Sequence, residues 1–281
     1  MIVTTRVSGS HGYARPGVAG SGTIACGLAA CASQIGEVRL LARSDAAAWR
    51  AEEGAQTEAK RIDGGSPARI RVTTEPADLG DCDLVVEAIV EDPGAKGELL
   101  ATLAAACADA DIASTTSSLR LAELATAGRA GDRLFGLHVF NPVSKMELVE
   151  VCLPAGLRDG VRERALGWCG ALGKTAVEVP DQPGFVVNRL LFPFLFEAVR
   201  LIEATGMRAE DVDACMRLGA AHPMGPLQLL DFVGLDVAAA IGDSLHADSK
   251  RESDAVPASL RDLVAQGKLG RKSGAGFYSY E

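Results

Sequence analysis

The sequence predicts an α/β protein with an N-terminal doubly wound sheet and a smaller, all-α C-terminal domain. Up to residue 180, short β-branched apolar runs alternate with alanine-rich stretches, which is the pattern of a parallel sheet wrapped by helices. Two prolines and a glycine then interrupt this pattern in the segment Pro180–Gly184. Because every strong periodicity beyond this segment is helical, we expect one domain at residues 1–182 and a second at residues 183–281.

The elements of the first domain follow from local composition. Strands are expected where aliphatic and β-branched residues cluster, at Gly17–Ala19, Glu37–Leu41, Arg69–Thr73, Asp83–Ala88, Ile112–Thr115, Leu134–Phe140, Glu147–Val151 and Thr175–Val179. Helices are expected where alanine, leucine and glutamate dominate, at Thr23–Gln34, Ala46–Lys60, Ala95–Ala108 and Leu121–Ala127. Because Pro16 lacks a backbone donor, we expect the first, central strand to be short or to start late.

The second domain is expected to contain helices alone. Apolar residues recur at three- and four-residue steps from Phe185 onward, which predicts one long helix that ends near Gly206. Further helices are expected at Ala209–Leu218, Pro226–Val233, Asp236–Ala247 and Pro257–Gln266, before a glycine-rich tail at Gly270–Gly276.

Composition excludes several classes of protein. The 281 residues are 48% hydrophobic, and 28 Lys and Arg against 37 Asp and Glu give a net charge of −9, which argues against a nucleic-acid partner but leaves an anionic substrate open. The seven cysteines are scattered without metal-ligand spacing, so we expect reduced thiols and no metal site. The N-terminus lacks the continuous apolar stretch of a signal peptide, and no segment approaches the ~18 uninterrupted apolar residues of a membrane span, so we expect a cytoplasmic protein without membrane contact.

A glycine motif predicts a nucleotide cofactor. Gly20, Gly22, Thr23 and Ile24 lie in the segment GSGTIA, which follows an apolar run, opens a helix and matches the GxGxxG/A dinucleotide fingerprint. The first glycine permits a tight turn, the second allows the backbone to approach the pyrophosphate, and the helix N-terminus supplies amide donors. At the start of a βαβ series, this motif predicts a Rossmann-type domain that binds NAD or NADP.

The residues after the second strand leave the choice between these cofactors open. An acidic residue at this point accepts hydrogen bonds from the ribose of NAD, but this chain has Ala42, Arg43 and Ser44. Without a carboxylate there, Arg43 and Ser44 are able to bind the 2′-phosphate of NADP. The alternative is that Arg43 only stacks on the adenine.

Six motifs carry a resemblance to a known family. They are VVEAIVED at Val85–Asp92, TTSSL at Thr115–Leu119, GLHVFNPVSKMELVEV at Gly136–Val151, DQPGFVVNRLL at Asp181–Leu191, HPMGPLQLLDFVGL at His222–Leu235 and GRKSGAGFYSY at Gly270–Tyr280. In this order they resemble the 3-hydroxyacyl-CoA dehydrogenases, which include bacterial 3-hydroxybutyryl-CoA dehydrogenases. The motifs span both expected domains.

The resemblance assigns catalytic roles to four residues. His138 and Glu150 are expected on successive strands, where an imidazole suited to moving a proton would have a carboxylate on its second nitrogen. They resemble the family's catalytic base and its partner. Ser117 and Asn188 match its two other polar active-site residues, and the resemblance implies that they hold the substrate's oxygen atoms. Without it, a lone strand histidine would be read as structural, Ser117 as a helix cap and Asn188 as a structural hydrogen-bonding residue.

Glu91 and Lys96 match family positions beside the cofactor, although either residue is also compatible with an ordinary solvated helix charge. The chain departs from the family between Ala42 and Val85, where a longer helical arm usually contributes contacts to CoA. A shorter thioester or an acyl carrier protein is therefore an open alternative to CoA.

The resemblance implies an oxidoreductase of fatty acid metabolism that interconverts 3-hydroxyacyl and 3-oxoacyl thioesters and forms a homodimer through its helical domain. Two alternatives remain: a dehydrogenase of a carrier-bound hydroxyacyl group or of another 3-hydroxy acid, such as a sugar acid, and a cofactor-binding protein without activity.

Overall fold

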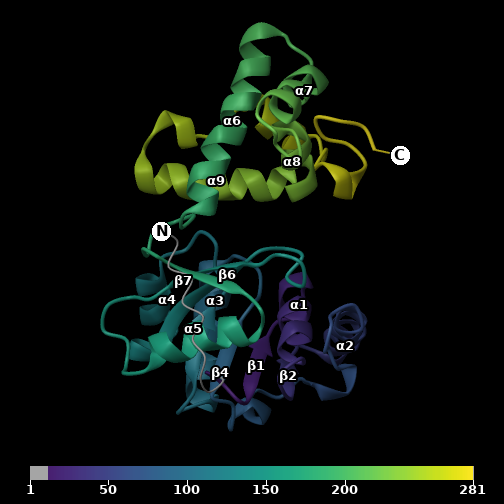
Figure 1. Ribbon diagram of the computed structural model, residues 1–281. Helices are drawn as coiled ribbons and strands as arrows, with labels where there is room; N and C mark the ends of the chain where they lie inside the picture. Colours follow the sequence, from purple (N-terminus) through teal and green to yellow (C-terminus); the bar gives the residue numbers. More distant parts are fainter. Residues whose placement is uncertain (1–11, 281) are drawn as a thin grey trace. The chain divides into compact units, whose positions relative to one another are not determined.

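The structure is a computed structural model that describes residues 12–280. The chain divides into two compact units, Met1–Gln182 and Pro183–Glu281, and each unit is described by itself. Figure 1 shows a sheet wrapped by helices in the first unit and helices in the second, which confirms the predicted fold class. The N-terminal residues that bear on the expected lack of a signal peptide lie outside the described range.

The first unit contains an eight-stranded sheet in the order β3-β2-β1-β4-β5-β6-β7-β8. Its strands are β1 Pro16–Ala19, β2 Val38–Leu41, β3 Ile70–Thr73, β4 Leu84–Glu87, β5 Asp111–Ser114, β6 Leu134–Val139, β7 Leu148–Cys152 and β8 Thr175–Val179. Neighbours are parallel from β3 to β6, whereas β7 is antiparallel to β6 and parallel to β8. The chain order reverses between β1 and β4, and ligands of such sheets bind at the carboxyl ends of the strands at this point.

The central strand β1 has four residues, as β2 to β5 do, and it begins at Pro16, so the expectation that the proline shortens the strand or delays its start was wrong. Pro16 is the first of its four residues, a position where the missing N–H removes no internal ladder bond. All four residues are buried.

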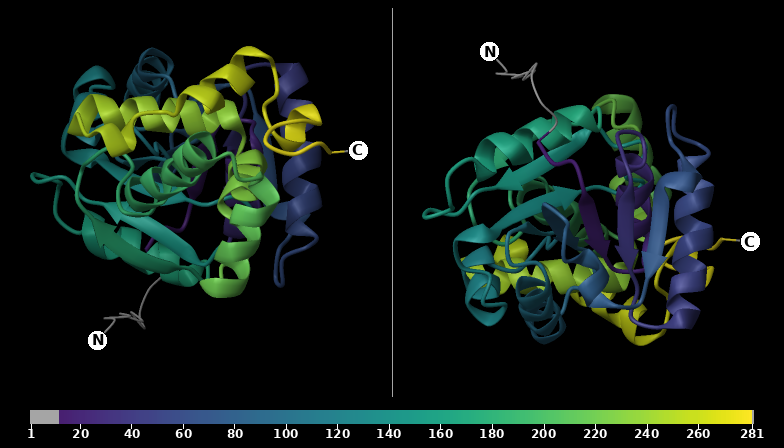
Figure 2. Two further views of the ribbon diagram at one scale, coloured as in Figure 1. Left: turned by 90° about the horizontal axis from the view of Figure 1, so that it is seen from above. Right: turned by 90° about the horizontal axis from the view of Figure 1, so that it is seen from below.

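Within residues 12–182, five α-helices cover the sheet: α1 Thr23–Ala32, α2 Asp45–Ala59, α3 Pro93–Ala106, α4 Leu121–Ala127 and α5 Val161–Ala171. Figure 2 shows α1 and α2 side by side. Small side chains permit this close packing: α2 buries alanines at four-residue spacing, and a Cβ added at Gly54 would lie only 3.4 Å from Cys26 Sγ. The stripe consists of Ala47, Ala51, Ala55 and Ala59.

Helix α5 was absent from the sequence prediction. Its segment contains Gly167 and Gly170 and three charged residues in its first four positions, which weaken both helix propensity and the apolar pattern. Tertiary packing decides its structure, because Val161, Ala165 and Trp168 are buried on one face at helical spacing.

The described part of the second unit, residues 183–280, contains five α-helices: α6 Val187–Thr205, α7 Ala209–Gly219, α8 Pro226–Val233, α9 Leu235–Ser249 and α10 Ala258–Ala265. The long helix α6 ends at Gly206, which adopts the left-handed conformation that favours glycine. Buried Asp213 accepts hydrogen bonds from the first-turn amides of Leu227 and Gln228 and thereby caps α8. None of the helices within residues 12–280 is both long and apolar enough to cross a membrane.

Candidate active site

The structure brings His138 and Glu150 together. They are a directly opposed pair of the antiparallel strands β6 and β7, so their side chains project from the same face of the sheet. His138 Nδ1 lies 2.7 Å from Glu150 Oε2, and the two side chains are only 7% and 2% exposed. The ring of Phe140 packs beside the imidazole, with 4.6 Å between ring centroids. A buried carboxylate at this distance orients the imidazole and stabilises its protonated form.

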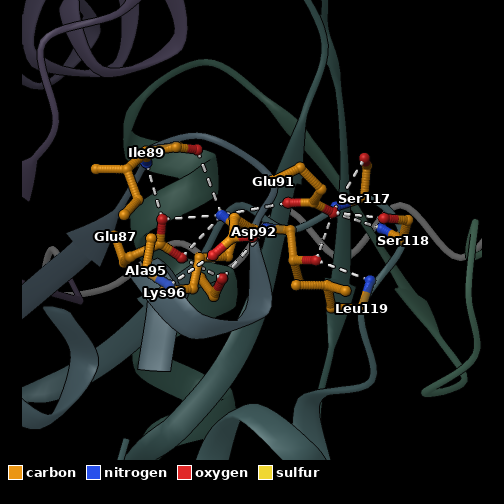
Figure 3. A network of polar contacts seen from close by, with 11 residues as sticks. Glu87, Ile89, Glu91, Asp92, Ala95, Lys96, Ser117, Ser118 and Leu119 are labelled. Atoms are coloured by element: carbon orange, nitrogen blue, oxygen red, sulfur yellow. Dashed lines mark hydrogen bonds and ion pairs between the residues drawn. The ribbon is translucent and has the colours of Figure 1, made fainter. Parts of the chain in front are cut away.

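Ser117 lies in the turn that follows β5, at the same edge of the sheet. One oxygen of Glu91, Oε1, accepts hydrogen bonds from the amides of Ser117 and Ser118, each at 2.8 Å, and from the hydroxyl of Thr116 at 2.7 Å. The Ser117 hydroxyl lies 3.4 Å from the same oxygen. Glu91 therefore connects the loop after β4 to the turn that presents Ser117 (Figure 3).

The charge state of Glu91 follows from these contacts. Burial alone would raise the pKa of its carboxyl group, but the ammonium of Lys96 and the hydrogen bonds from the Thr116–Ser118 turn outweigh burial and hold the pKa below its ordinary value. The carboxylate is therefore ionised at neutral pH and remains an acceptor for the turn.

Lys96, expected beside a cofactor, is almost fully buried, with 1% of its side chain exposed. Its Nζ atom lies 2.8 and 3.0 Å from the two carboxylate oxygens of Glu87 and 3.3 Å from Glu91 Oε2. In this arrangement the ammonium faces protein carboxylates.

The glycine motif forms the turn between β1 and α1. Gly20 has a φ of 149°, and a Cβ at this position would lie 2.3 Å from the carbonyl oxygen of Ala88, so only glycine fits. Gly22 is the N-cap of α1, and a Cβ there would meet nothing within 4 Å. No side chain caps the helix, whose first residues are Thr23 and Ile24. Their amides suit an anionic group such as a pyrophosphate.

The residues that follow β2 carry no carboxylate. Ala42 is buried and its amide donates to the carbonyl of Thr73, while Ser44 is the N-cap of α2 and accepts a 3.4 Å hydrogen bond from Ala47. Arg43 is exposed, and within residues 12–280 no ion pair or hydrogen bond engages its guanidinium group.

Asn188 belongs to the second unit, as the second residue of α6. It is buried, with 8% of its surface exposed. No group of at least three His, Cys, Asp or Glu residues within residues 12–280 is arranged to hold a metal ion.

Comparison with protein families explains this combination of features. Residues 16–182 match the NAD binding domain of 3-hydroxyacyl-CoA dehydrogenase, and residues 184–280 match its C-terminal domain. The chain belongs to the 3-hydroxyacyl-CoA dehydrogenase family. The resemblance drawn from the sequence motifs is thereby confirmed.

Individual relatives of this family member agree with the assignment. The chain is 42% identical over 211 residues to 3-hydroxybutyryl-CoA dehydrogenase of Mycobacterium tuberculosis, a match that covers 74% of each protein. It is 48% identical over 201 residues to the mitochondrial hydroxyacyl-coenzyme A dehydrogenase of Mus musculus, which covers 71% of this chain and 64% of that enzyme. The crystal structure of (S)-3-hydroxybutyryl-CoA dehydrogenase PaaH1 from Ralstonia eutropha superposes with a TM-score of 0.89 at 33% identity, covering 96% of this chain and 99% of that one.

The sequence motifs did not single out Glu87, which lies next to the predicted site residues Glu91 and Lys96 of this dehydrogenase-family member. Glu87, the last residue of β4, is fully buried and pairs with Lys96. The available signal was a single carboxylate within the apolar run LVVEAIV, because a buried carboxylate requires a partner.

Proposed function

We propose that this protein interconverts 3-hydroxyacyl and 3-oxoacyl thioesters with a nicotinamide cofactor. The observation that carries the proposal is the His138–Glu150 pair, held at 2.7 Å on adjacent strands of an NAD-binding domain. The relatives named as 3-hydroxybutyryl-CoA and hydroxyacyl-coenzyme A dehydrogenases support the same substrate class.

His138 is the proton carrier in this proposal. Because its Nδ1 is committed to Glu150, exchange with the substrate's C3 oxygen falls to Nε2. During oxidation the imidazole takes the hydroxyl proton and Glu150 stabilises the imidazolium; during reduction both changes reverse. The bound nicotinamide supplies the hydride acceptor or donor for C3.

Ser117 and Asn188 are proposed to bind the substrate's oxygen atoms. The turn that contains Ser117 is fixed by Glu91, which gives its hydroxyl a defined place at the carboxyl edge of the sheet. Asn188 lies buried in the first turn of α6, and its side-chain amide can both donate and accept a hydrogen bond, which suits a substrate oxygen.

The turn after β1 is proposed to hold the cofactor's pyrophosphate through the amides of Thr23 and Ile24. This turn suits a pyrophosphate, because Gly20 and Gly22 have no side chain that would block access to the backbone amides at the N-terminus of α1. Glu91 and Lys96 are proposed to border the cofactor site and to act through the loops that they hold.

For the cofactor, we propose that NADP(H) is used at least as well as NAD(H). The end of β2 offers no carboxylate to repel a 2′-phosphate, and the guanidinium of Arg43 is exposed without an ion-pair partner in the described chain. Ser44 adds a hydroxyl next to it. Comparison of kcat/KM for NADPH and NADH tests this preference, and a strong preference for NADH would contradict it.

The acyl group is proposed to be carried by CoA or by an acyl carrier protein. The protein is proposed to bind only weakly the part of either carrier that is distant from the thioester. Only one α-helix, α2, lies between β2 and β3. Among the basic residues nearby, Arg61 and Arg71 pair with glutamates and Arg69 binds carbonyl oxygens. Arg50 and Lys60 have no such partner within residues 12–280 and are the candidates for attracting an anionic carrier.

The assembly is proposed to be a homodimer formed through the second unit. This unit exposes several large apolar side chains, a composition that suits burial by another chain: Leu190, Leu218, Phe232 and Val237. Sedimentation velocity tests the oligomeric state.

We propose a cytoplasmic location, because the scattered cysteines are expected to be reduced thiols, as is usual in the cytosol.

A spectrophotometric screen tests the proposed function as a whole. Acetoacetyl-CoA, longer 3-oxoacyl-CoAs, the pantetheine thioester and carrier-bound substrates are each combined with NADH and NADPH, and cofactor oxidation is followed by absorbance. We expect turnover of at least one short 3-oxoacyl thioester. If both cofactors bind and none of these substrates is reduced, the protein is a cofactor-binding protein or acts on another 3-hydroxy acid.

A further inference from the structure

The carboxylate of Glu87 occupies a position that a structural role alone does not explain. Glu87 ends β4 and lies opposite Ser114, which ends the parallel strand β5. Its Oε2 accepts a 2.6 Å hydrogen bond from the Ser114 hydroxyl, and its Oε1 accepts one of 2.8 Å from the amide of Ile89. With 0% of its side chain exposed, Glu87 is anchored by groups at the carboxyl edge of two adjacent strands.

Lys96 connects the anchored carboxylate of Glu87 to a second carboxylate, that of Glu91. Helix α3 directs its ammonium between Glu87 and Glu91, and the carbonyl oxygen of Ile89 lies 3.5 Å away. Both Glu87 oxygens bind the ammonium, so the buried cation is fixed mainly by Glu87. The remaining contact, 3.3 Å to Glu91 Oε2, then fixes the direction in which Glu91 points.

Glu91, oriented by Lys96, in turn binds the turn after β5. Its second oxygen receives the amides of Ser117 and Ser118 and the hydroxyl of Thr116 (Figure 3). A continuous path of charge-assisted contacts therefore runs from Glu87 through Lys96 and Glu91 to the turn that contains Ser117.

We infer that Glu87 is a positioning residue for the reaction: through Lys96 and Glu91 it holds the Thr116–Ser118 turn and sets the place of the Ser117 hydroxyl. The inference rests on the proposed function for the role of Ser117. Glu87 itself touches neither substrate nor cofactor in this account.

The chemistry of burial favours a positioning role over simple stabilisation. Replacing a buried ion pair by apolar residues of similar volume is often neutral or stabilising, so stability alone does not require this pair. Two carboxylates here share one ammonium, and the arrangement aligns one oxygen of Glu91 with three consecutive residues of the turn. Such an arrangement fixes the orientation of the Glu91 carboxylate and of the turn bound to it. A turn that positions a substrate requires a fixed orientation.

The first test compares Glu87→Gln with Glu98→Gln, a matched substitution on the exposed surface of α3. We expect kcat for a 3-oxoacyl thioester to fall about 10- to 100-fold in Glu87→Gln, as a small displacement of a positioning group does. We also expect faster hydrogen exchange at the amides of Ser117 and Ser118, which donate to Glu91. Glu98→Gln leaves both quantities unchanged.

A double variant separates positioning from stabilisation. Glu87→Gln alone leaves the ammonium of Lys96 buried with a weaker partner and lowers Tm. Combining it with Lys96→Met removes that charge, so we expect Tm to recover while kcat stays low, because Glu91 has lost its cation. Recovery of kcat together with Tm would overturn the inference and make the pair purely structural.

The exchange measurement distinguishes a failure of this inference from a failure of the proposed function. If the wild-type protein reduces no 3-oxoacyl thioester, the proposed function fails, and faster exchange in Glu87→Gln still supports a role for Glu87 in holding the turn. Unchanged exchange at Ser117 and Ser118, or an unchanged kcat in an active enzyme, overturns the inference.

Discussion

Two buried carboxylates at opposite ends of adjacent strands show how position in the sheet separates structure from function. Asp111 begins β5, and Glu87 ends the neighbouring strand β4. Both are shielded from solvent and both have cationic partners. Their surroundings differ: Glu87 connects to loops at the carboxyl edge, where ligands of parallel sheets bind, whereas Asp111 lies at the amino edge.

The partners of Asp111 connect segments that are far apart in the chain. It accepts a 2.7 Å hydrogen bond from the hydroxyl of Tyr13 and 2.8 Å hydrogen bonds from the Nε atoms of Arg158 and Arg164. Burial, followed by the hydrogen bond to Asp111, raises the pKa of Tyr13 far above its ordinary value, so the phenol stays a donor at all ordinary pH values. Asp111 thus fastens the chain before β1 to the region of α5. We expect substitutions at the carboxyl edge to change activity and those at Asp111 to change stability.

The largest effect is expected at His138, on the carboxyl side of β6. His138→Gln removes the proton carrier and leaves the turn at Gly20 intact, so kcat should fall by about 10²–10⁴-fold while cofactor affinity is kept. Single-turnover kinetics measures the first quantity and fluorescence titration with the reduced cofactor the second. Wild-type turnover in an assay limited by chemistry would remove His138 from the mechanism.

Glu150→Gln should have the next largest effect. The imidazolium loses a charge-assisted hydrogen bond worth about 1.5–3 kcal/mol, which corresponds to a loss of about 10- to 100-fold in kcat. Stopped-flow measurement of the chemical step in the variant and in the wild type gives this ratio. An unchanged rate would assign Glu150 a structural role only.

A smaller change is expected after β2. Ala42→Asp restores an acceptor for ribose hydroxyls and adds repulsion toward a 2′-phosphate, so the ratio of kcat/KM for NADPH to that for NADH should fall about tenfold or more. Direct binding of both cofactors to the variant provides a measurement that is independent of turnover. A ratio equal to that of the wild type would place the ribose away from this residue.

The smallest effect on activity is expected at the amino edge. Asp111→Asn weakens the acceptor shared by Tyr13 and two arginines, so the free energy of unfolding should fall by about 2 kcal/mol. Because none of these partners lies at the carboxyl edge, kcat measured well below the melting temperature should match the wild type. Urea unfolding and steady-state assays on the same preparation decide this, and a large loss of kcat would erase the difference between the two edges.

The sequence predicted most of the fold because its local signals agree. The apolar runs of the strands and the glycine turn at Gly20 are each recognisable from a few consecutive residues. The fold class and the family are confirmed. Helix α5 was missed since its charged residues and glycines hide a face that only tertiary packing reveals. Sequence motifs drew attention to His138 and Glu150, but the role of Glu87 was hidden because its partners lie 9 and 27 residues away.

Transfer of an isotopic label shows whether the protein moves a hydride between the nicotinamide cofactor and C3 of the substrate with His138 as the proton carrier. Acetoacetyl-CoA is incubated with the protein and with reduced cofactor carrying deuterium at either face of C4, and the product is analysed by mass spectrometry. We expect 3-hydroxybutyryl-CoA with deuterium at C3 from one of the two labelled cofactors, and a strongly reduced yield from His138→Gln. Absence of deuterium at C3 in the wild-type product, or an equal yield from the variant, would contradict it.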